Sequence, residues 1–90
     1  MTKDIIDRRN KLNIILDKIQ PDLKRGERLH PDFAEGVYQA LGFLGEEYGE
    51  VSREITKGEP GWEKRMDSEL FDLIVVAIRM LLRDYERKTE

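Results

Sequence analysis

Residues 33–55 read FAEGVYQALGFLGEEYGEVSREI, and this stretch decides the fold. Its apolar side chains recur every three or four residues, a spacing that places them along one face of an α-helix. The stripe consists of Phe33, Val37, Leu41, Leu44, Tyr48, Val51 and Ile55. Pro31 suits the first turn of this helix, and Gly58 suits the position that ends it. A long helix is therefore predicted from about Pro31 to Gly58.

A second long helix is predicted after the turn formed by residues 58–61, GEPG. Its apolar positions keep helical spacing, at Trp62, Met66, Leu70, Leu73, Ala77 and Met80. Two long helices joined by a tight turn form an antiparallel hairpin. Between Leu70 and Leu82 every residue except Asp72 and Arg79 is apolar, so this helix is hydrophobic on nearly all sides.

The first part of the chain predicts a shorter helix. Apolar residues at helical spacing run from about Lys3 to Gln20, where Pro21 is expected to stop the helix, and the residues up to His30 read as a connector. One further helix beside the hairpin cannot cover the apolar segment 70–82. The predicted fold is therefore all-α: a three-helix chain that completes a four-helix-bundle-type core by oligomerisation, as a homodimer or a homotetramer.

Length and composition narrow the class of protein. Ninety residues make one small domain, residues 1–90. The chain is 39% hydrophobic and 39% charged, a balance that excludes a disordered tail and a membrane protein. Its charged N-terminus and lack of a long apolar run predict a cytoplasmic location without a membrane partner, and its net charge of -3 disfavours a nucleic-acid partner. With no cysteine and one histidine, any metal is expected to be held by oxygen atoms.

Two pairs of acidic residues are expected to face each other across the hairpin. Glu47 and Glu50 are three residues apart on the first long helix, and Glu69 and Asp72 have the same spacing on the second. At about 1.5 Å per residue, Glu50 and Glu69 both stand about 12 Å from the turn. Crowded carboxylates repel one another and need cations, and Mg²⁺ suits them, with Mn²⁺ as an alternative. The four residues are therefore candidate metal ligands.

The acidic motifs also resemble those of a known family. Residues 44–51, LGEEYGEV, followed by residues 69–72, ELFD, are similar to the Glu-x-x-Glu and Glu-x-x-Asp signature of the MazG-like all-α nucleoside triphosphate pyrophosphohydrolases. The resemblance covers roughly His30 to Tyr85. It implies a Mg²⁺-dependent enzyme that cleaves a nucleoside triphosphate between the α and β phosphates, giving a nucleoside monophosphate and pyrophosphate. It also implies helical bundles assembled as dimers or tetramers.

The phosphoanhydride hydrolysis that the resemblance implies requires a general base and residues that bind phosphate. Metal ions neutralise the phosphates while a water attacks, and either Glu47 or Glu50 is the candidate general base. Arg79 and Arg83 lie two and three helical turns beyond Asp72 and are candidate phosphate-binding residues. For Arg79, a structural ion pair with a carboxylate such as Asp72, or with an acid of a neighbouring subunit, is the alternative.

Two other classes of function stay open at this point. A non-catalytic helical interaction module would use the apolar stripes for oligomerisation, and its acids would be ordinary solvated groups paired with lysine or arginine. A nucleotide-binding sensor would bind its ligand without turnover. Mg²⁺-dependent release of pyrophosphate separates the enzyme from both.

Overall fold

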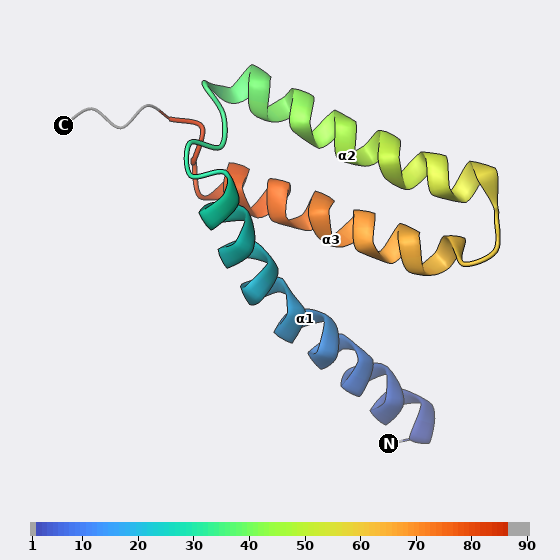
Figure 1. The fold of residues 1–90 in the computed structure, drawn as a ribbon. Helices are drawn as coiled ribbons and strands as arrows, with labels where there is room; N and C mark the ends of the chain where they lie inside the picture. Colours follow the sequence, from blue (N-terminus) through green and yellow to red (C-terminus); the bar gives the residue numbers. More distant parts are fainter. Residues whose placement is uncertain (1, 87–90) are drawn as a thin grey trace.

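The structure is a computed structural model that describes residues 2–86. Three helices follow one another, α1 (Lys3–Leu29), α2 (Val37–Lys57) and α3 (Trp62–Leu81), and no strand occurs among residues 2–86. α2 and α3 lie side by side as an antiparallel hairpin, and α1 leads diagonally away from the end of α3 that is remote from the hairpin turn (Figure 1). The predicted all-α class and the helical hairpin are therefore confirmed.

The turn of the hairpin is built on its glycines. Gly58 adopts a left-handed conformation with φ 59°, and its N–H donates to the Glu54 carbonyl at 3.2 Å, which ends α2 where the sequence predicts. Gly61, with φ 83°, precedes α3. Arg65 ties the turn together, because its guanidinium donates to the Glu54 carboxylate at 2.7 Å and to two carbonyls of the turn. These contacts fix the register of α2 against α3.

The first helix is longer than the sequence predicts. α1 continues through Pro21 to Leu29, so the expected end at Gln20 is wrong and the expected connector is helical. A proline inside a helix removes a hydrogen bond and costs about 3 kcal/mol. Packing of the following turns against α3 offsets this cost. The approach is close, since a Cβ atom on Gly26 would meet Val75 Cγ1 at 3.1 Å.

The second helix starts later than the sequence predicts. α2 begins at Val37, after Gly36 with φ 112°, so the expected start at Pro31 is wrong. Residues 31–36 form the connection between α1 and α2, in which Phe33 has a positive φ of 30°. The chain changes direction sharply within this connection (Figure 1). A helix that began at Pro31 would leave no residues for that change of direction.

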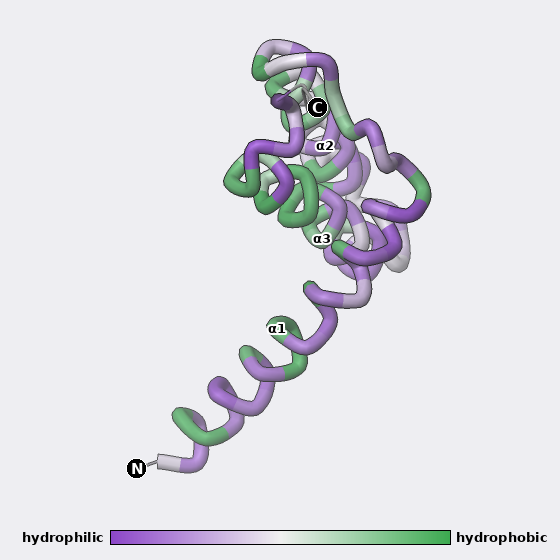
Figure 2. The backbone as a smooth tube through the Cα atoms, turned by 90° about the vertical axis from the view of Figure 1, so that its left-hand side faces the viewer, coloured by the Kyte–Doolittle hydropathy of each residue, from purple (hydrophilic) through white to green (hydrophobic). Residues whose placement is uncertain are grey.

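The chain buries little apolar surface by itself. Within residues 2–86 the buried apolar residues are Ala34, Ala40 and Val51, and no large side chain is fully buried. Large apolar side chains remain exposed on α1 and α2, for example Ile14 at 68% and Leu41 at 55%. Figure 2 shows the N-terminal part of α1 standing clear of the hairpin, with hydrophobic segments along its length. Among residues 2–86, none of the three helices combines the length and the hydrophobicity of a membrane span.

Candidate metal centre

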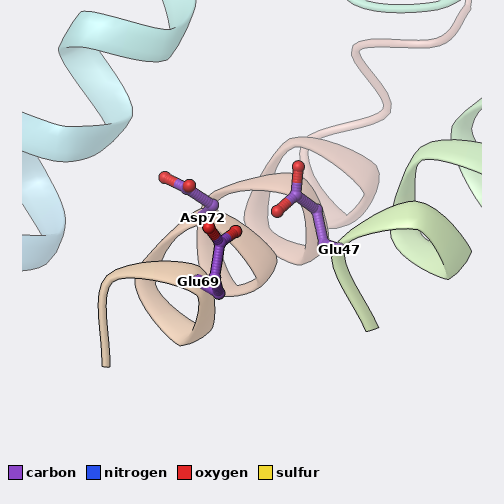
Figure 3. Close-up of side chains that lie close together, drawn as sticks. All are labelled: Glu47, Glu69 and Asp72. Atoms are coloured by element: carbon purple, nitrogen blue, oxygen red, sulfur yellow. The ribbon is translucent and has the colours of Figure 1, made fainter. Parts of the chain in front are cut away.

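Three carboxylates converge between α2 and α3. Glu47 projects from α2, and Glu69 and Asp72 project from α3 one turn apart (Figure 3). One carboxylate oxygen from each residue lies within 4.8 Å of the other two. The spacing of three residues brings Glu69 and Asp72 to one side of α3, and the register of the hairpin brings Glu47 to the same height. These three residues are called the acidic triad below.

Glu50 is the predicted ligand that does not join the triad. Its Oε2 accepts a hydrogen bond from Arg53 Nη1 at 2.8 Å, within α2 itself. Glu50 nevertheless lies one helical turn from Glu47 on the same side of α2. Its charge adds to burial and to the triad charges in raising the pKa of Glu47 and Glu69. The structure therefore brings together three of the four predicted ligands and places the fourth at their edge.

The triad is electrostatically costly without a cation. Burial raises the pKa of all three carboxyls, and neighbouring carboxylates further raise the pKa of Glu47 and Glu69. Glu47 Oε2 is buried and has no hydrogen-bond partner among residues 2–86. An unsatisfied buried polar atom costs about 1–3 kcal/mol, and more when it is charged. A hard divalent cation would neutralise the triad and give this oxygen a partner, so the donor set fits Mg²⁺.

The raised pKa values predict how stability depends on pH. Without metal, the folded protein binds more protons than the unfolded chain as the pH rises above the ordinary glutamate pKa of 4.5. The free energy of unfolding contributed by the triad is therefore expected to fall with rising pH through that window. Glu47→Gln should make the fall shallower in urea unfolding measured with a chelator present. A fall equally steep in both proteins would contradict the coupling of Glu47 to the other carboxylates.

A cavity of about 290 Å³ opens beside the triad. Glu47 lines it together with Phe33 and Phe43, whose ring centroids lie 5.9 Å apart. Val75 and Val76 of α3 add to its apolar wall. Glu47 is thus the member of the triad that borders a partly enclosed space with aromatic and aliphatic sides. An organic group attached to metal-bound phosphates would find room there.

Arg79 lines the same cavity and is held by structural contacts. The residue is only 4% exposed. Its Nε donates to Asp84 Oδ2 at 2.8 Å, and its Nη1 donates to the carbonyls of Gly26 at 3.2 Å and His30 at 2.7 Å. Its carboxylate partner is therefore Asp84 and not the Asp72 expected as the alternative. Through the two carbonyls, Arg79 anchors the end of α1 to α3, while its role toward phosphate stays a prediction.

Arg83, the second predicted phosphate-binding residue, is not among the residues that line this cavity. α3 ends at Leu81, and Arg83 has a left-handed backbone with φ 63°. Its Nη1 donates to the Met80 carbonyl at 3.0 Å, and the residue is exposed. In the sequence Arg83 continues the helical row that contains Asp72 and Arg79, but α3 ends at Leu81, before the row reaches Arg83. Its role toward phosphate also stays a prediction.

The sequence reasoning missed charged residues of α1 that lie near the triad. Burial has the largest effect on the pKa of Asp72 and raises it. Arg25 and Lys18 lower this pKa, whereas Asp22 raises it further. Their spacing of four and three residues is a helical signal, but it crosses Pro21. Because Pro21 predicts the end of the helix, the sequence does not place Lys18 on one helical side with Asp22 and Arg25.

Comparison of the chain with models of protein families, with curated proteins and with solved structures finds no match. The resemblance of the acidic motifs therefore stays a prediction. What the site can do chemically follows from its carboxylates, the cavity beside them and the nearby cations.

Proposed function

We propose that this protein is a Mg²⁺-dependent nucleoside triphosphate pyrophosphohydrolase, which cleaves between the α and β phosphates to release a nucleoside monophosphate and pyrophosphate. The observation that carries the proposal is the acidic triad, with the buried Glu47 oxygen that lacks a partner. Resemblance of the same residues to the MazG-like signature supports the reaction type. The adjoining cavity offers space for the nucleoside.

The triad supplies the ligands that this reaction requires. When bound, Mg²⁺ neutralises phosphate charge and keeps coordination positions for water. Glu47, Glu69 and Asp72 would hold it, and Mn²⁺ suits the same oxygen ligands. Glu47 and Glu50 remain the candidates to accept a proton from the attacking water. Glu50 suits that role because it lies beside the triad without being part of it.

The test of the proposal is product analysis on a panel of nucleoside triphosphates. Phosphorus NMR distinguishes pyrophosphate from inorganic phosphate and so identifies the bond that is cleaved. Mg²⁺-dependent formation of a monophosphate and pyrophosphate is expected with at least one member of the panel. Binding without any product would favour a nucleotide sensor. Neither binding nor product would favour an interaction module.

We further propose that the protein works as a homodimer or homotetramer. A folded monomer of 10.6 kDa exposes about 5,500 Å² of surface, whereas this chain exposes 7397 Å². The excess of about 1,900 Å² is comparable to the area that one subunit of an obligate dimer covers. Gly42, Gly45 and Gly49 have open space where a Cβ would lie, so a neighbouring helix has room to approach α2 there.

Light scattering is expected to give two or four times the 10.6 kDa mass of one chain. Leu41→Lys, which places a charge on an exposed apolar position of α2, should shift the mass toward that of one chain. Ser52→Lys, at an exposed polar position of the same helix, is the matched control and should leave the mass unchanged. A monomeric wild-type protein at micromolar concentration would contradict the assembly.

A further inference from the structure

A row of three charged residues runs along the side of α1 that is next to α3. Lys18, Asp22 and Arg25 are four and three residues apart, which places them along one side of the helix. Lys18 Nζ lies 2.8 Å from Asp22 Oδ2 and 4.8 Å from the ring centroid of Phe71, the residue before Asp72. Asp22 is only 9% exposed. This part of α1 therefore packs on α3 beside the triad.

The position of this row is fixed by tight packing one residue further on. A Cβ atom on Gly26 would meet Val75 Cγ1 at 3.1 Å, so the backbone of α1 comes close to α3 one turn beyond Asp72. In Figure 3 the carboxylate of Asp72 extends toward the pale blue ribbon of α1, whereas Glu47 enters from α2 on the other side. α1 and α2 thus lie on opposite sides of the triad (Figure 3).

Arg25 is the cation of this row that has no structural partner. Lys18 is paired with Asp22, but among residues 2–86 no carboxylate lies within 4.0 Å of the Arg25 guanidinium. Arg25 is also exposed, and it directly precedes Gly26, the residue at which α1 packs on α3 one turn beyond Asp72. A guanidinium that lies near the candidate metal centre and forms no ion pair can bind an anion that is coordinated to the metal.

We propose that Arg25, assisted by Lys18, binds the phosphate groups of the substrate that project from the metal ion toward α1. The inference rests on the proposed function and names residues that neither the motifs nor the resemblance assigns. A triphosphate keeps negative charge after one divalent cation has bound, and a guanidinium donates two parallel hydrogen bonds to phosphate oxygens. The triad would hold the metal from α2 and α3, and α1 would supply the cations for the phosphates.

The test compares two ligands on the same variants, inorganic tripolyphosphate with Mg²⁺ and Mn²⁺ alone. Arg25→Gln is expected to weaken tripolyphosphate binding by about tenfold or more, because it removes charge-assisted hydrogen bonds. The same variant should bind Mn²⁺ alone as tightly as the wild-type protein, because Arg25 supplies no oxygen ligand to the ion. A merely structural role for Arg25 would weaken both ligands together.

Lys24→Gln is the matched control, because it removes the same charge one residue away. Lys24 is exposed and lines a different pocket, with Leu16 and Gln20. It should leave tripolyphosphate binding within about twofold, since an exposed charge that touches no ligand contributes little. The inference is overturned if Arg25→Gln and the wild-type protein bind tripolyphosphate equally, or if the wild-type protein does not bind it. Failure of the proposed function would show separately, as absence of product from every nucleotide in the panel.

Discussion

Replacing Asp72 by asparagine is expected to lower Mg²⁺-dependent pyrophosphate release by about 100-fold or more, because a metal ligand loses its charge and keeps its shape. Asp72 is the member of the triad that faces both Glu47 across the hairpin and the cations of α1. The fold should survive. Burial raises the pKa of Asp72, so removal of its charge relieves a cost in the metal-free protein. Turnover and thermal unfolding measured on the same sample check both statements.

Asp67→Asn provides the control for this substitution. Asp67 is the same residue type on the same helix, but it is exposed and lies outside the triad. Its replacement should leave turnover within about twofold, as is usual for a surface substitution. Near-normal turnover by Asp72→Asn would show that Asp72 is not a ligand. A loss of turnover accompanied by unfolding would show that it acts on the fold instead.

Arg79→Ala is expected to destabilise the protein by about 3–5 kcal/mol, the cost of removing one partner from a buried ion pair. The substitution leaves Asp84 without its arginine and removes Nη1, which donates both hydrogen bonds to the end of α1. It also removes the guanidinium that lies 4.7 Å from the Phe33 ring centroid. Chemical denaturation of the variant and the wild-type protein measures the difference.

Arg79→Lys separates charge from geometry at this position. A lysine keeps the positive charge but cannot reach Asp84 and two carbonyls at once, so it should recover only part of the lost stability. If Arg79→Ala instead kept its melting temperature and raised KM or lowered kcat, the arginine would serve the substrate rather than the fold. Unchanged stability together with unchanged kinetics would eliminate both roles.

The hairpin was predictable because its signals are local. The apolar stripe of α2 from Val37 onward, the left-handed Gly58 and the turn before Trp62 depend on residues close together in the sequence, and the structure has them where they are expected. Phe33, the first residue of the predicted stripe, lies outside the helix. The triad followed from the hairpin, because equal distances from one turn place acids at equal height. Glu50 does not join the triad as predicted, because its carboxylate accepts a hydrogen bond from Arg53, three residues away.

The errors arose where tertiary contacts override local signals. Pro21 is expected to end a helix, but the turns that follow it pack so closely on α3 that the helix continues. Because of that one error, the predicted site does not include the cations of α1, Lys18 and Arg25. For the same reason the sequence does not predict the carbonyl partners of Arg79, His30 and Gly26, which lie 49 and 53 residues away. No local pattern indicates contacts over such a separation.

The central claim is that the acidic triad holds a divalent cation. A Mn²⁺ titration followed by electron paramagnetic resonance tests it most directly, because the signal of free Mn²⁺ falls as the ion binds and the measurement does not depend on the choice of nucleotide. The wild-type protein is expected to bind Mn²⁺, to release it to excess Mg²⁺, and to lose the site in the Glu47→Gln and Asp72→Asn variants while Asp67→Asn retains it. Binding that is equally strong in all four proteins, or no binding at protein concentrations up to about 1 mM, would contradict the account.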